Sequence, residues 1–142
     1  MRALAFIDSS IIVQGFKGEK KALKILKELC DFIHKIKLSI NIIVFSETIY
    51  QLTYKRKFTL EEVILFLDKF KFFPTNEEVK NKALKYMEVY KLRPNDAIIL
   101  ATCKYYGIKY LISIDKDFPE PCKKEGIVLI NSAEKLKEVL NK

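Results

Sequence analysis

Short, mainly apolar runs alternate with amphipathic stretches along the whole chain. The runs, several of them rich in β-branched residues, predict buried strands. These expected strands cover residues 3–7, 40–45, 70–73, 110–114 and 127–130. Between them, apolar residues recur at helical spacing with lysines on the opposite face, which predicts helices. The expected helices cover residues 19–36, 46–57, 59–67, 75–90, 95–107 and 132–140.

Local signals support several of these helix boundaries. Thr59-Leu-Glu-Glu62 and Thr75-Asn-Glu-Glu78 have the pattern of a capping box, in which each side chain accepts from the other residue's backbone amide. Ser132 can cap the last helix, and Gly107 can end the helix before the fourth strand. The alternation of strands and helices predicts an α/β fold: a three-layer sandwich with a mostly parallel sheet of about five strands.

Length and composition fit one folded domain that covers residues 1–142. Of the 142 residues, 49% are apolar and 31% are charged, which is typical of globular chains rather than disordered ones. No apolar run approaches the ~20 residues of a membrane span, and Asp8 interrupts the N-terminal run too early for a signal peptide. We therefore expect a cytoplasmic protein that does not enter a membrane.

Cysteine and histidine offer little for catalysis or for zinc binding. The three cysteines lack C-x-x-C spacing, and we expect Cys30 to fill space in the core. His34, the only histidine, falls within a predicted helix, where a structural role is favoured over a catalytic one. Gly15 and Gly18 are expected in a turn, and no glycine-rich phosphate-binding motif is present. These features argue against triad, zinc and nucleotide-binding chemistry.

Acidic residues stand where the predicted strands end. Asp8 directly follows the first strand, Glu47 lies two residues beyond the second in the first turn of its helix, and Asp115 closes the fourth. Asp117 comes two residues later. Ligands of open parallel sheets bind beyond the carboxyl ends of the strands, so we expect these acids at one edge. Asp96 begins the helix that leads into the fourth strand. If that helix is antiparallel to the strands, we expect its start at the opposite edge, so the pattern alone does not place Asp96.

A cluster of carboxylates at this edge would favour a hard metal ion. Several carboxylates within a few ångströms of one another cannot all stay ionised without a cation. Oxygen ligands select Mg²⁺ or Mn²⁺ over zinc, and such a site can promote in-line hydrolysis of a phosphodiester. Each acid also has a structural explanation on its own. Asp8 can cap a helix, Asp115 can belong to a turn, and Glu47 suits the N-terminal end of a helix. Their joint placement favours the metal site.

Four acidic motifs of this chain resemble those of the PIN domain family. They are Asp8-Ser-Ser-Ile-Ile, Ser46-Glu47-Thr-Ile, Asn95-Asp96-Ala-Ile-Ile-Leu-Ala-Thr and Leu111-Ile-Ser-Ile-Asp115-Lys-Asp117-Phe118. The motifs occur in the family's order and cover nearly the whole chain. The resemblance implies a parallel sheet flanked by helices, and a metal-dependent endoribonuclease that hydrolyses RNA phosphodiester bonds.

The resemblance also implies roles for particular residues. It places four carboxylates in one catalytic metal site: Asp8, Glu47, Asp96 and Asp115. Asp117 is expected either as a further ligand or beside the ligands. Ser9 and Ser113 hold positions where the family often has a hydroxyl, and we expect them to orient the acids. Ile114 is a departure, because the family frequently has Asn there, and a polar contact beside the metal is lost.

Many small PIN proteins resemble VapC-type toxins, which pair with an antitoxin. By this resemblance we expect an RNA substrate, a cognate antitoxin and a homodimer. Two alternatives remain open: a nuclease of RNA maturation or turnover without a toxin role, and a non-catalytic PIN fold that binds RNA or protein. Retention of all four acids argues against the non-catalytic alternative, whereas Ile114 favours it.

The charge of the chain agrees with RNA as a partner. The formal net charge is +8, which suits a polyanion, although a lysine-rich surface that only keeps the protein soluble would have the same charge. The candidate contacts to the RNA backbone are Lys55, Arg56, Lys57 and Arg93. Tyr50, Tyr54 and Tyr105 could stack on bases, but we expect them to pack in the core.

Overall fold

Five parallel strands form the centre of the structure, a computed structural model that describes residues 2–141. The strands are β1 (Ala3–Ile7), β2 (Ile36–Ile40), β3 (Lys71–Phe72), β4 (Tyr110–Ile112) and β5 (Val128–Ile130). They lie in the order β3-β2-β1-β4-β5, and every neighbouring pair is parallel. β1 is therefore the central strand, and its Phe6 lies opposite Ser39 of β2 and Leu111 of β4.

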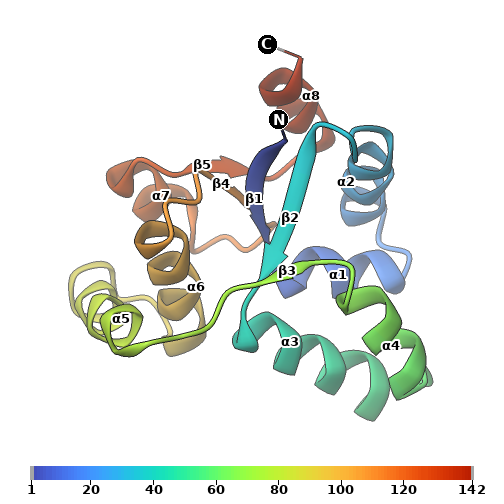
Figure 1. Cartoon of the computed structure of the whole chain (residues 1–142), viewed down its shortest axis with the longest axis horizontal. Coiled ribbons are helices and arrows are strands. Elements are labelled where there is room, and N and C mark those ends of the chain that lie inside the picture. The colour runs from blue at the N-terminus through green and yellow to red at the C-terminus, as the bar shows by residue number, and fades with distance from the viewer. Residues whose placement is uncertain (1, 142) are drawn as a thin grey trace.

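Helices cover both faces of this sheet. They are α1 (Ser9–Phe16), α2 (Lys20–Asp31), α3 (Ile42–Ile49), α4 (Leu60–Leu67), α5 (Glu77–Tyr90), α6 (Pro94–Tyr105), α7 (Pro119–Glu125) and α8 (Ala133–Leu140). α3 continues directly into η1 (Tyr50–Tyr54), a short π-helix. Figure 1 shows α1 and α2 on one side of the strands and α5, α6 and α7 on the other, with α3 beyond the end of β2. The predicted three-layer α/β fold is confirmed, and its sheet is parallel throughout.

The interior follows from the strands being apolar on both faces. Because helices cover both sides of β1, its residues Ala5, Phe6 and Ile7 are all fully buried. Phe118, between β4 and α7, is also fully buried and belongs to the same core. Within residues 2–141, no helix is both long enough and apolar enough to cross a membrane.

The predicted helix starts are partly confirmed. Thr59 and Glu62 form the expected capping box, since each accepts from the other's backbone amide at 3.1 Å. Ser132 caps α8 as expected. At the other predicted capping box the cap is Asn76, whose side-chain oxygen accepts from the Val79 amide at 2.9 Å, so Thr75 was the wrong residue.

The second strand lies earlier than the sequence pattern predicts. β2 ends at Ile40, and most of the segment expected as a strand at 40–45 forms the start of α3 instead. The cause is Asn41, a fully buried residue whose side-chain oxygen accepts from the Val44 amide at 3.1 Å and so begins a helix. Its amide group also donates to Thr102 Oγ1 at 3.0 Å, which fixes the start of α3 against α6.

Two predicted helix ranges shift with this strand. The helix expected over 19–36 ends at Asp31, because the last residues of that range form a turn and the start of β2. The helix expected over 46–57 starts earlier, at Ile42, and ends as the π-helix η1. The predicted fourth strand, 110–114, is shorter and stops at Ile112.

The sequence pattern does not predict α1 or α7. α1 contains Gly15, which was expected in a turn but lies where α1 crosses α2. A β-carbon at this position would come within 2.2 Å of Leu26 Cδ1, so any larger residue would force the Leu26 side chain to shift. Gly18 does lie in the turn between them, with a φ of 83°.

Cys30 and His34 are also placed differently from the prediction. Cys30 is exposed on α2 rather than buried in the core. His34 lies in the exposed turn between α2 and β2, because the helix ends before reaching it. Neither residue contacts the candidate site described below.

Candidate functional site

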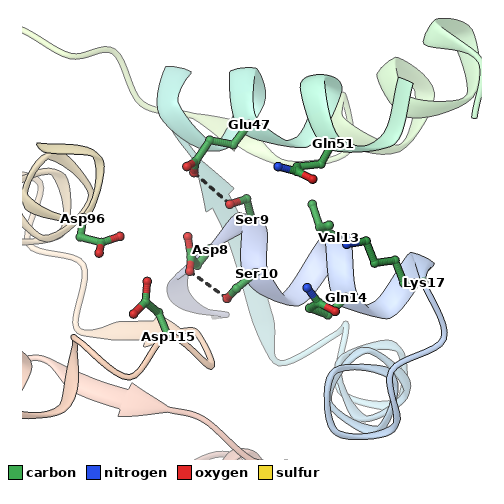
Figure 2. A pocket seen from close by; sticks show the side chains of 10 residues that line it. All are labelled: Asp8, Ser9, Ser10, Val13, Gln14, Lys17, Glu47, Gln51, Asp96 and Asp115. Carbon is green, nitrogen blue, oxygen red and sulfur yellow. Dashed lines mark hydrogen bonds between the residues drawn. The ribbon is translucent and has the colours of Figure 1, made fainter. Parts of the chain in front are cut away.

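The strand order creates a crevice beside the central strand. From β1 the chain moves outward through β2 to β3, and it then returns to the other side of β1 as β4. The carboxyl ends of β1 and β4 therefore flank the point where the order reverses, the usual binding position in such sheets. A pocket of about 240 Å³ opens there, and four carboxylates line it: Asp8, Glu47, Asp96 and Asp115. Figure 2 shows their side chains pointing into a common space.

Asp8 enters the pocket directly from the end of β1. Its backbone amide donates to the Ile112 carbonyl at 2.9 Å, which continues the pairing of β1 with β4 for one more residue. Asp8 precedes α1 in the N-cap position, but its side chain caps nothing. The carboxylate instead accepts from Ser113 Oγ and Ser10 Oγ, each at 2.8 Å. The structural explanation of Asp8 as a helix cap is therefore wrong.

Asp115 and Glu47 reach the pocket from positions that differ from the prediction. Because β4 stops at Ile112, Asp115 lies in the loop after the strand instead of closing it. Because α3 begins at Ile42, Glu47 lies in its second turn rather than its first. The favourable position at a helix N-terminus therefore does not explain Glu47.

Asp96 joins the pocket from the first turn of α6, with Pro94 at the start of the helix. The expectation that this turn lies at the opposite edge was wrong. A helix that leads into a parallel strand ends at the strand's amino end, so an antiparallel helix starts at the carboxyl edge. The fold alone thus brings Asp96 to the other acids.

Burial and the neighbouring charges both disfavour the ionised forms of two acids in the pocket. Burial, and then the charges of Asp115 and Asp8, raise the pKa of Asp96 to about 7. Burial also raises the pKa of Asp8, whose side chain is only 4% exposed, and the hydrogen bonds from Ser113 and Ser10 lower it in part. A cation in the pocket would relieve this repulsion.

Hydroxyl and amide groups hold the acids in place. Ser9 Oγ donates to Glu47 Oε1 at 2.9 Å, and Asn95 Nδ2 donates to Glu47 Oε2 at 3.2 Å. Ser113 Oγ, which donates to Asp8, also accepts from the Asp115 amide at 3.0 Å. The structure thus brings the predicted serines into contact with the acids. Sequence reasoning assigned no role to Ser10 and Asn95, although both belong to the matched motifs.

Asp117 and Ile114 lie at the margin of the site. Asp117 is exposed, and one of its carboxylate oxygens lies within 4.8 Å of an oxygen of Asp96 and one of Asp115. Its backbone amide donates to Asp115 Oδ1 at 2.9 Å, which orients that carboxylate. The Ile114 side chain packs against the core instead of facing the acids, while its backbone amide donates to Ser10 Oγ at 3.3 Å.

A second hollow continues from the acidic pocket along α1 and η1. It is lined by Phe16, Lys17, Gln51, Lys55, Arg56, Lys57 and Phe58. Lys17 and Gln51 line both hollows, so the basic hollow lies directly beside the acidic pocket. Sequence reasoning missed both Lys17 and Gln51. Gln51 could have been found, because it follows Glu47 by one turn of the predicted helix and so shares its face. Arg93 is exposed at the N-cap of α6, three residues before Asp96.

Fold and site together define a parallel α/β protein with a carboxylate pocket at the switch point of its sheet, beside a basic hollow. The chain belongs to the PIN domain family, whose sequence model matches residues 5–124. This match confirms the family resemblance of the four acidic motifs.

Two archaeal relatives and one solved structure illustrate the similarity. A Methanocaldococcus jannaschii protein named ribonuclease VapC6 is 38% identical over 138 residues, covering 80% of this chain and 89% of the relative. Ribonuclease VapC2 of the same organism is 31% identical over 134 residues, covering 80% and 85%. A toxin–antitoxin complex from Klebsiella pneumoniae contains a similar fold, with a TM-score of 0.66, 24% identity and coverage of 81% and 90%.

Proposed function

We propose that this protein is a metal-dependent endoribonuclease and the toxin of a toxin–antitoxin pair. One observation carries the proposal: carboxylates from four separate segments converge in one pocket that lies beside a basic hollow. Membership of the PIN family and the 38% identity to a protein named as a ribonuclease support RNA as the substrate. An acidic pocket within a basic surface suits a phosphate backbone that is held outside and cut inside.

The donors in the pocket fit Mg²⁺ or Mn²⁺. They are all carboxylate oxygens, which favour hard cations, and the pocket lies open to solvent at the edge of the sheet. Burial and the neighbouring acids raise the pKa values of Asp8 and Asp96, and a bound cation would favour their charged forms. Asp8, Glu47, Asp96 and Asp115 would hold the ion, with Asp117 at the rim. The ion would activate water and stabilise negative charge on the scissile phosphate.

The remaining residues of the site position these groups and the substrate. Ser113 and Ser10 orient Asp8 through its Oδ2 atom, and Ser9 orients Glu47 through its Oε1 atom. In the adjoining hollow, Lys17 and the basic residues 55–57 provide cations that can contact successive phosphates of an RNA strand. We propose that Arg93 contacts the same backbone from the α6 side of the pocket.

Metal dependence is the first test of this function. We expect purified protein to cleave a mixed-sequence single-stranded RNA with added Mg²⁺ or Mn²⁺ and to stop when EDTA is in excess. Restoring the cation to the chelated sample should restore the rate, which separates metal removal from irreversible unfolding. Folded protein that leaves RNA intact under all of these conditions would contradict the proposal and favour the non-catalytic alternative.

Replacing Ser113 by Ala should weaken cleavage without abolishing it. Loss of its hydrogen bond leaves Asp8 less well oriented, and such supporting contacts affect metal affinity or activity by about 10–100-fold. The matched control is Ser132→Ala, which removes a helix cap in α8 and should lower stability by about 1 kcal/mol while leaving cleavage unchanged. Measuring initial rates against Mg²⁺ concentration would show the loss, and equal rates for the two variants would contradict the role of Ser113.

We further propose that the antitoxin docks in an apolar groove between α2, β2 and α4. The groove has a volume of about 690 Å³ and is lined by Leu23, Leu26, Ile33, Phe66 and Phe70. Its rim carries Arg2, Lys27, Lys37 and Lys69, which suits an amphipathic segment with acidic flanks. The solved toxin–antitoxin complex with a similar fold supports a partner of this kind.

The partner proposal can be tested at the groove. A small reading frame beside this one should encode a protein that co-purifies with this chain and inhibits cleavage. Ile33→Glu changes an exposed residue of the groove and should abolish that inhibition while leaving RNA cleavage in place. Inhibition that survives the substitution would contradict the docking site.

We also propose a homodimer, for which light scattering should give about twice the 16.6 kDa of one chain.

A further inference from the structure

Two tyrosines beside the site are exposed, contrary to the expectation that they pack in the core. Tyr50 is 53% exposed and Tyr54 is 76% exposed. Large aromatic side chains are costly to leave in water, and a pair of them on one helical segment needs an explanation. Tyr105 is also exposed, at 41%, but it lies at the far end of α6 from Asp96.

The local helix geometry places the two rings together. Both belong to the π-helix η1, in which the Lys55 amide donates to the Tyr50 carbonyl at 3.1 Å. The ring centroids are 6.5 Å apart with an interplanar angle of 27°, so the two ring planes are close to parallel. π-Helical segments are rare and occur frequently at functional sites. Here the segment carries the only exposed stacked aromatic pair among the described residues.

Neither tyrosine lines the hollows that we assign to the RNA, but residues next to them in the sequence do. Gln51, between them in sequence, lines both the acidic pocket and the basic hollow. Lys55 lines the basic hollow, and its Nζ lies 5.4 Å from the centre of the Tyr50 ring. Tyr50 and Tyr54 follow Glu47 by one and two helical turns, which places them within about 10 Å of it along the axis.

We propose that Tyr50 and Tyr54 form a stacking platform for unpaired bases of the RNA substrate. This inference rests on the proposed function and assigns the contacts with the bases to these two residues. Bases in a duplex are already stacked on one another, so only unpaired bases can lie on the rings. The lysines and arginine of the basic hollow would hold the backbone while the tyrosines bind the bases. The positive charge of this surface favours RNA over an apolar protein partner.

Binding measurements on the intact chain can test the platform. The Asp8→Asn protein, which should bind RNA without cutting it, serves as the parent for Tyr50→Ala, Tyr54→Ala and both Phe replacements. We expect each Ala variant to weaken binding of a labelled single-stranded RNA about tenfold, since stacking contributes roughly 1–3 kcal/mol per base. The Phe variants should bind like the parent, and so should the control Tyr105→Ala, an exposed tyrosine elsewhere.

Base dependence distinguishes stacking from other roles. The parent and the Ala variants should bind an abasic RNA strand with equal affinity. They should also have equal affinities for a fully paired duplex. Equal losses on abasic and normal RNA, or no loss in either Ala variant, would overturn the platform. So would unchanged RNA binding together with a changed oligomeric state, which would indicate a protein contact. Cleavage by the unmodified protein reports the proposed function separately, so the two can fail independently.

Discussion

Replacing Asp8 by Asn is expected to reduce RNA cleavage by about 10³-fold or more. The substitution keeps the shape of a side chain that is 4% exposed, but it removes one of the charges that the cation requires. Metal ions stabilise the transition state of such reactions by several kcal/mol, and each 1.36 kcal/mol corresponds to a tenfold change in rate. Ser113 and Ser10 can still donate to the remaining side-chain oxygen, so the fold should persist.

Cleavage rates and thermal unfolding should be measured on the same preparations. Asp31→Asn is the matched control, because it makes the same change of charge at the exposed end of α2. The control should cleave at the parent rate. A melting temperature that falls sharply in Asp8→Asn would instead assign Asp8 a structural role, and retained cleavage would remove it from the catalytic site.

Replacing Asp96 by Asn is expected to stabilise the metal-free protein increasingly as the pH rises from about 4 to about 7. The pKa of Asp96 rises from 3.8 to about 7 on folding, so the folded state holds a proton that the unfolded state has already lost. Between these values, raising the pH therefore destabilises the parent protein. The Asn variant has no proton to lose at this position and escapes the penalty.

The melting temperatures of parent and variant should be similar near pH 4. Near pH 7.5, in EDTA, the melting temperature of the variant should be higher than that of the parent by about 5 °C. This figure allows for solvent screening, because Asp96 is only partly buried. Adding Mg²⁺ at the higher pH should raise the melting temperature of the parent more than that of the variant, because only the parent retains all four carboxylates. A difference in melting temperature that stays constant with pH would contradict a raised pKa for Asp96 in the folded protein.

The sequence predicted which acids line the pocket better than it predicted the strands and helices on which they lie. Asp8 could be placed because it follows an uninterrupted apolar run that forms the central strand. Asp96 needed the family resemblance, although correct reasoning about helix direction would have placed it at the same edge. Glu47 was chosen correctly as a member of the cluster, but its strand and helix were misassigned.

The errors have two physical causes. β-Branched residues 42–44 favour a strand locally, but the Asn41 side chain accepts from the Val44 amide and so begins a helix. Asn41 is held in this position by its burial and by its contact with Thr102. The exposure of Tyr50 and Tyr54 likewise depends on the π-helix, which rotates side chains away from the positions of an α-helix. Lys17 could not be considered while α1 was unpredicted, because its place beside Gln51 depends on that helix.

The order of the strands has a consequence for synthesis of the protein on the ribosome. β1 is the first strand to emerge, yet one of its edges stays open until β4 is made, after residue 110. The pocket needs carboxylates from residue 8 to residue 115, so a nascent or truncated chain that lacks the last quarter contains no complete site. A ribosome translating this protein would therefore be exposed to an active nuclease only once nearly the whole chain has been completed.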